Sequence, residues 1–167
     1  MLAGILLLGC TQILAQTKRW AVGFKLGEPT GLNIRKYGDR NALDMTLGTY
    51  GGLLAQQKAY RKGRYQGTGL MLNGTYLWYA AFFNGHLTTY AGVGAQVNSR
   101  KYYEERFGTV NVYARSISVG PSGTAGFEIF SRAKASSFFL EVGGYAELVP
   151  DFLYVSPQIS VGARTNF

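Results

Sequence analysis

Apolar and polar residues alternate along most of this chain, most regularly over residues 153–167. There, Val155 and Val161 occupy odd-numbered positions, whereas the even-numbered positions are mostly polar and include Arg164. Successive side chains of a β-strand point to opposite faces of the sheet. The pattern therefore predicts a strand with one apolar and one polar face, which ends at Phe167.

The same period of two recurs in seven earlier segments. The predicted strands span 19–27, 31–37, 42–50, 67–82, 87–98, 112–130, 136–147 and 153–167. The links alternate between three tight turns (38–41, 83–86, 131–135) and the segments 28–30, 51–66, 99–111 and 148–152. Outer-membrane barrels have short periplasmic turns, longer outside loops and both termini in the periplasm. We therefore expect an all-β fold, an eight-stranded antiparallel up-and-down transmembrane β-barrel in a bacterial outer membrane, with both termini periplasmic.

One tight turn allows the predicted strands to be aligned residue by residue. Around the turn 38–41, Ile34 faces Met45 on the apolar side of the sheet and Arg35 faces Asp44 on the polar side. Paired residues of an antiparallel ladder point the same way, so a wrong register would mix the two faces. The faces agree, which supports this turn.

A second turn, at 83–86, gives the same result independently. It has an Asn-Gly pair at its centre, a strong hairpin signal. It pairs Trp78 with Ala91 on the apolar side and Tyr79 with Tyr90 on the polar side. Two unrelated turns therefore predict one consistent pair of faces.

The segment 120–123 also resembles a turn, because it contains Gly, Pro and Ser. A two-residue hairpin there would pair Val119 with Thr124, which belong to opposite faces. The apolar phase continues unchanged on both sides of the segment. We therefore interpret 112–130 as one long strand with a local irregularity near Pro121.

The alternation fits either a soluble barrel with the apolar face inside or a membrane barrel with it outside. On the polar face, glycines such as Gly92 and Gly126 alternate with Ser, Thr and large aromatic residues such as Tyr90. A soluble surface would carry many Lys and Glu residues there instead. The composition therefore favours a membrane barrel with a polar lumen filled by side chains.

The first fifteen residues are apolar without alternation. They end at Ala15, which fits cleavage after a small residue, so we predict a signal peptide over 1–15 and a barrel domain over 16–167. A Leu-Leu-Gly-Cys segment also resembles a lipoprotein motif with Cys10 as the lipidated residue, and this alternative stays open. After cleavage no cysteine would remain, which excludes disulfides and cysteine-based metal sites. Outside this segment, no stretch reaches the roughly 18 apolar residues of a membrane helix.

The formal net charge of +8 raises the question of an anionic partner. Nucleic acid is not favoured for an exported, strand-rich chain. Much of the excess lies in the predicted loops 51–66 and 99–111, where solvated loops are one interpretation and a surface for anionic lipid head groups is another. The candidate anion-binding residues are Lys58, Arg61, Lys62, Arg64, Arg100 and Lys101.

The polar face carries a nearly balanced set of charges. The predicted luminal charge cluster is Lys25, Arg35, Asp44, Glu128, Glu141 and Arg164. An eight-stranded barrel is just wide enough for side chains to fill it, so these residues should form a salt-bridged plug. A proton or ion relay is the alternative, and it would need a path for water.

The segment 27–37 (GEPTGLNIRKY), followed by the residues 41–45 (NALDM), resembles small outer-membrane proteins of Bacteroidetes with OmpX- or OmpA-like barrels. In those proteins a Gly-x-Pro-x-Gly turn joins the first two strands. The resemblance implies insertion by the outer-membrane assembly machinery, with Phe167 as the assembly signal. It implies no defined activity.

Three functions remain in view. We favour a non-catalytic surface protein with a structural, adhesive or envelope-stabilising role, monomeric and without cofactor or metal, with lipopolysaccharide and outer-membrane lipid as partners. A lipid A-modifying enzyme would need a nucleophile and a base near the outer leaflet, yet the one histidine, His86, falls in a predicted periplasmic turn. A small channel or transporter would need a wider lumen than eight strands leave.

Overall fold

The computed structural model describes residues 19–51, 59–60, 63–65, 68–82, 86–104, 113–131, 135–150 and 152–167, which form ten β-strands. The strands are β1 (Trp20–Glu28), β2 (Thr30–Tyr37), β3 (Asn41–Tyr50), β4 (Ala59–Tyr60), β5 (Gly63–Tyr65), β6 (Gly69–Phe82), β7 (Leu87–Glu104), β8 (Tyr113–Phe130), β9 (Ser136–Glu147) and β10 (Tyr154–Asn166). Among these residues, no helix is long and apolar enough to cross a membrane.

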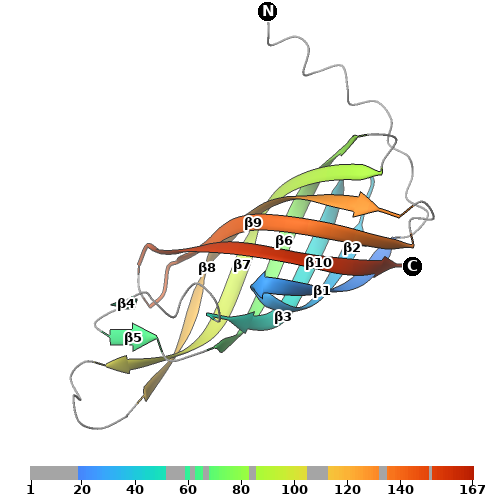
Figure 1. Cartoon of the computed structure of the whole chain (residues 1–167). Coiled ribbons are helices and arrows are strands. Elements are labelled where there is room, and N and C mark those ends of the chain that lie inside the picture. The colour runs from blue at the N-terminus through green and yellow to red at the C-terminus, as the bar shows by residue number, and fades with distance from the viewer. Residues whose placement is uncertain are drawn as a thin grey trace, which may run out of the picture.

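Eight of the strands close into a barrel (Figure 1). Each is antiparallel to its two neighbours, in the order β1-β2-β3-β6-β7-β8-β9-β10, and β10 pairs back onto β1. Apart from β7, the barrel strands begin and end within two residues of the predicted bounds. The predicted eight-stranded antiparallel up-and-down barrel is therefore confirmed.

Both predicted hairpin registers are confirmed. Arg35 pairs with Asp44 across β2 and β3. Tyr79 pairs with Tyr90 across β6 and β7, in the same ladder that extends to the end of β6. The hydrophobic pattern and the turn lengths together were sufficient to specify these pairings, because a one-residue slip would exchange the two faces.

The two ends of the barrel differ. At one end, β1 begins beside the end of β10, where the Trp20 amide donates to the Phe167 carbonyl (3.1 Å) and the Phe167 amide donates to the Trp20 carbonyl (2.8 Å). At the opposite end, β7 and β8 project beyond the wall together with β4 and β5 (Figure 1). The strand ends that flank the three tight links, those of β2 and β3, β6 and β7, and β8 and β9, lie at the first end, together with the start of β1.

The prediction that 51–66 and 99–111 are loops is wrong in part. Strand β7 continues to Glu104, and its extension pairs with β8 on one edge and with β5 on the other. Strands β4 and β5 form a small hairpin within the first segment. The alternation of apolar and polar residues ends before this region. Hydrogen bonds between strands do not require an apolar face, however, so β7 and β8 stay paired beyond the part of the barrel that has one.

Strand β8 runs through Pro121 without a turn, as predicted, and Pro121 pairs with Ala95 of β7. The local irregularity lies on the neighbouring chain segment. The amides of Leu148 and Val149 both donate to the carbonyl of Val119, at 3.0 and 3.2 Å. Leu148 and Val149, which follow β9, thus oppose the single residue Val119 of β8. This arrangement is a β-bulge, and it lies where the regular pairing of β9 with β8 has ended.

The wall is apolar outside and polar inside. Exposed apolar side chains cover the outer face, among them Trp20, Phe24, Leu32, Met45, Leu72, Trp78, Val93, Ile129, Phe138, Val142 and Ile159. Buried polar side chains fill the interior, among them Asn33, Thr46, Gln96, Asn98, Ser118, Ser137 and Ser160. This polarity is the reverse of that in a soluble protein and is typical of a barrel whose outer face contacts lipid.

Inward and outward glycines meet different surroundings. Gly94 of β7 faces inward, where a Cβ atom would collide with the carbonyl oxygen of Gly74 and lie 2.8 Å from the Cα atom of Thr75. Gly74 of β6 faces outward, and a Cβ atom there would meet nothing within 4 Å. Only the inward position therefore requires a glycine for packing.

We expect Gly94→Ala to lower the free energy of unfolding by about 1–3 kcal/mol, because the added methyl group overpacks the wall. Gly74→Ala is the matched control, since both substitutions restrict the unfolded chain equally. Urea unfolding in phospholipid vesicles, followed by tryptophan fluorescence, measures the difference. Equal stabilities of the two variants would contradict this packing.

Candidate functional site

Six strands direct one charged side chain each into the lumen at a similar level. The residues are Lys25 (β1), Arg35 (β2), Asp44 (β3), Glu128 (β8), Glu141 (β9) and Arg164 (β10). All six are the residues named from the sequence as the luminal charge cluster. The structure brings them into one network of direct ion pairs, which we call the luminal charge network.

Arg35 is the centre of this network and is fully buried. Its Nε lies 2.6 Å from Asp44 Oδ2, its Nη1 3.2 Å from Glu128 Oε2, and its Nη2 2.8 Å from Glu141 Oε1. The Nη1 group also donates to the hydroxyl of Tyr79 (2.5 Å). One guanidinium therefore connects three carboxylates from three strands, which the fork geometry of arginine permits.

Arg164 is a second bridging cation and pairs with two of the same carboxylates. Its Nη1 lies 3.0 Å from Glu128 Oε1 and its Nη2 3.0 Å from Glu141 Oε1. Its Nε donates to Asn33 Oδ1 at 2.6 Å. The guanidinium also lies over the ring of Phe139, 3.5 Å from the centroid, in a cation–π contact.

Lys25 completes the charge balance. Its Nζ lies 2.6 Å from Glu141 Oε2 and 3.6 Å from Asp44 Oδ1. Three cations and three carboxylates therefore share one buried volume. A buried charge is tolerated only when it is paired and its remaining hydrogen-bonding positions are filled.

Neutral side chains fill those remaining positions on the carboxylates. The hydroxyls of Tyr37 and Ser137 donate to Glu128 Oε1, at 2.9 and 2.6 Å. The hydroxyl of Tyr90 donates to Glu141 Oε1 at 2.6 Å. Tyr37 and Ser137 had no assigned role in the sequence; both have inward parity, but parity does not show which carboxylate they reach.

A second, uncharged layer lies between the charge network and the end that carries β4 and β5. Gln96 is its centre: its Oε1 accepts from Gln158 Nε2 (2.8 Å) and Asn73 Nδ2 (3.2 Å), and its Nε2 donates to Asn98 Oδ1 (2.9 Å). Asn98 in turn donates to Ser118 (3.3 Å). The register predicted around the turn 83–86 also sets Asn73 opposite Gln96, and the structure has this pairing, but the register alone does not predict the layer.

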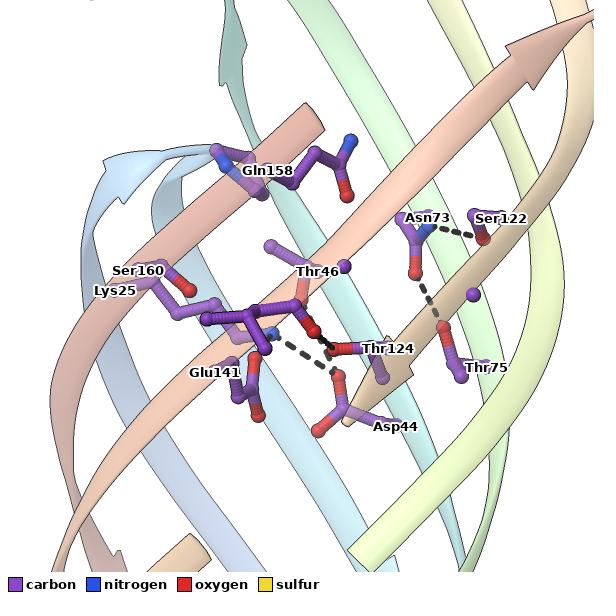
Figure 2. A pocket seen from close by; sticks show the side chains of 14 residues that line it. Lys25, Asp44, Thr46, Asn73, Thr75, Ser122, Thr124, Glu141, Gln158 and Ser160 are labelled. Atoms are coloured by element: carbon purple, nitrogen blue, oxygen red, sulfur yellow. Dashed lines mark hydrogen bonds and ion pairs between the residues drawn. The ribbon is translucent and has the colours of Figure 1, made fainter. Parts of the chain in front are cut away.

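A cavity of about 20 Å³ separates the two layers. Figure 2 shows Lys25, Asp44 and Glu141 on one side of it and Asn73 and Gln158 on the other. This volume is about that of a single water molecule. Within the described part of the lumen, the side chains therefore form a packed plug without a wide pore.

The other candidate residues lie elsewhere. Lys58, Arg61 and Lys62 are outside the described residues, and for Arg64, Arg100 and Lys101 the structure describes only their place in strands β5 and β7. Phe167 is exposed at the end of β10, beside Trp20. His86 is exposed in the turn before β7, at the end of the barrel where the chain terminates. Within the described ranges, no group of His, Cys, Asp and Glu could hold a metal ion.

Two solved structures share this architecture. The N-terminal β-barrel domain of Pseudomonas aeruginosa OprF has a TM-score of 0.62 and 13% identity, over 89% of this chain and 95% of that one. Neisserial surface protein A has a TM-score of 0.56 and 9% identity, over 89% and 93%. No protein-family model and no curated protein matches the sequence. The fold defines the class: the chain is a small eight-stranded transmembrane β-barrel protein.

We expect Asp44→Ala to lower the free energy of unfolding by about 3–5 kcal/mol, because Arg35 would lose its shortest ion pair and stay buried. Asp39→Ala removes the same side chain from the exposed turn between β2 and β3 and should leave stability nearly unchanged. Heat-modifiable migration on gels and unfolding in vesicles measure both variants. An unchanged melting transition for Asp44→Ala would show that the network does not stabilise the barrel.

Proposed function

We propose that this protein is an integral outer-membrane protein with a structural, adhesive or envelope-stabilising role and no catalytic activity. The plugged lumen is the observation that carries the proposal. A barrel whose interior is occupied by a closed, balanced charge network offers its function only on its lipid face and at its ends. The shared fold of the two solved outer-membrane barrels supports this placement in the membrane.

The difference between the two ends supports a periplasmic position for both termini. The strand ends that flank the tight links and the start of β1 lie at one end, while the longer β7 and β8 project at the other (Figure 1). Short turns on the periplasmic side and longer segments outside are the usual arrangement. The extended end is then extracellular.

The segments 51–66 and 99–111 are the proposed interaction surface. Strand β5 pairs with the extension of β7, with Arg64 opposite Tyr103, so parts of both segments belong to one sheet. Their basic residues are thus candidates for a common surface. Lipopolysaccharide phosphates are the proposed partner, because arginine binds phosphate oxygens bidentately.

The position of His86 gives no support to a lipid A-modifying enzyme, because it lies at the end opposite β4 and β5. The described lumen gives no support to a channel, because the charge network and the Gln96 layer occupy it. The resemblance to barrels of Bacteroidetes and recognition of Phe167 during assembly stay predictions, as does the signal peptide over 1–15, which lies outside the described residues.

Charge reversal of Arg61, Lys62 and Arg64 to glutamate should weaken lipid A binding at least about tenfold, because three attractive charges become repulsive. The control swaps Arg and Lys at the same positions and retains the charge, so most binding should persist. Co-purification of lipid A with the detergent-solubilised barrel measures this. Unchanged binding after charge reversal would remove these residues from the proposed surface.

The plugged lumen also predicts that the purified protein forms no stable conducting state in planar bilayers. An eight-stranded barrel filled by side chains leaves no continuous path for hydrated ions. Long, discrete openings that scale with protein amount would contradict the proposal and favour a channel.

A further inference from the structure

The lipid-facing surface contains a groove over strands β6 to β9. Its floor consists of small residues, among them Ala91, Gly123 and Ala125, and its sides include Trp78 and Val142. Its volume is about 600 Å³. Small-molecule sites are typically about 300–1,000 Å³, so the groove is large enough for part of a lipid.

Trp78 forms a defined side of this groove. Its ring packs edge-to-face against Tyr76, with centroids 5.1 Å apart and an interplanar angle of 73°. About half of the Trp78 side chain stays exposed towards the groove and the lipid. A tryptophan held by a neighbouring ring gives the groove a fixed wall on one side.

The groove and the luminal cavity lie on the two faces of one part of the barrel wall. Gly123, Thr124, Val142 and Gly143 border both. The Thr124 hydroxyl donates to the Val142 carbonyl (3.4 Å), so it is satisfied within the wall. An unfilled depression facing hydrocarbon would forfeit dispersion contacts, so an apolar chain that fills it is favoured.

The strand registers connect the groove to a cationic rim. Asn41 pairs with Trp78, Trp78 with Ala91, and Ala91 with Ala125, so these outward residues form one row. Barrel strands are tilted by about 35–45°, so such a row runs obliquely from the rim into the membrane. Arg40 immediately precedes Asn41 at the rim end of this row, and its carbonyl accepts from the Tyr79 amide (3.0 Å).

The rim beside Arg40 is positive overall. Lys36 is exposed on the neighbouring strand β2, and Arg19 is exposed immediately before β1. Lys36 Nζ lies over the Trp20 ring, 5.2 Å from its centroid. Asp39 is the one acidic residue in the turn 38–41. The position of cations at the level of interfacial tryptophans matches the depth of lipid phosphates.

We propose that this groove and rim bind one anionic phospholipid. An acyl chain lies in the groove over Ala91 and Ala125, against Trp78, and the head-group phosphate contacts Arg40. The site is on the lipid face at the end where the chain terminates, opposite the proposed lipopolysaccharide surface. This lipid site follows from the barrel fold and does not rest on the proposed function.

The test uses the full chain in vesicles with Trp20→Phe, which leaves Trp78 as the only tryptophan. Phosphatidylglycerol with brominated acyl chains, diluted into phosphatidylcholine, quenches a tryptophan that it contacts. We expect the brominated anionic lipid to be enriched at Trp78 about five-fold over its bulk fraction, the factor expected for one cation near a membrane surface. Brominated phosphatidylcholine, diluted into unbrominated phosphatidylcholine, should show no enrichment.

Two pairs of variants test the acyl-chain groove and the head-group contact separately. Ala91→Leu with Ala125→Leu fills the groove and should abolish the enrichment, whereas Ala163→Leu, on the exposed outer face of β10, should preserve it. Arg40→Ala should abolish the preference for the anionic head group, whereas Arg40→Lys, which retains the positive charge, should preserve it. Heat-modifiable migration verifies that each variant is folded.

Equal quenching by the two brominated lipids, measured in the protein whose groove is not filled by leucines, would overturn the proposal. Such a result is expected when lipids contact the barrel without preference. Enrichment that survives filling of the groove would overturn the chain site. Enrichment that is unaffected by Arg40→Ala would overturn the head-group contact. None of these outcomes depends on lipid A binding or on conductance.

Discussion

The neutralisation of charge inside a narrow lumen is the constraint on which the rest of this structure depends. The bilayer outside the wall provides no solvent for an unpaired charge, and the lumen has little room for water. Arg35 and Arg164 meet the constraint by bridging carboxylates from β3, β8 and β9. Because these partners come from distant parts of the chain, the network forms only when the barrel is closed.

On each strand, the residues that alternate with the luminal ones point outward, and they are mostly apolar. Large apolar residues cover most of it, but small residues leave a groove where β6 to β9 meet. The cavity inside and the groove outside lie back to back at Gly123 and Gly143. Glycines therefore form part of the wall between the cavity and the groove, and lipid is the natural cover for its outer side.

The sequence was sufficient to predict the strands, two hairpin registers and the six residues of the luminal charge network. Alternation determines which face a side chain occupies, and a tight turn determines its neighbour across one hairpin. Neither determines which residues meet across the lumen: Arg35 reaches Glu141, 106 positions away, only through the curvature of the whole barrel. The extension of β7 and the hairpin β4–β5 were missed because their pairing requires no lipid-facing pattern.

Hydrogen exchange of the arginine Nε–H groups tests the central claim most directly, because it reports burial and pairing of each guanidinium in the folded barrel. Nuclear magnetic resonance of the refolded protein in micelles can resolve these protons, with the exposed Arg40 as an internal reference. The luminal charge network predicts slow exchange at Arg35 and Arg164, whose Nε atoms lie 2.6 Å from Asp44 and from Asn33. Exchange at both sites as fast as at Arg40 would show a hydrated, open lumen and would contradict the account.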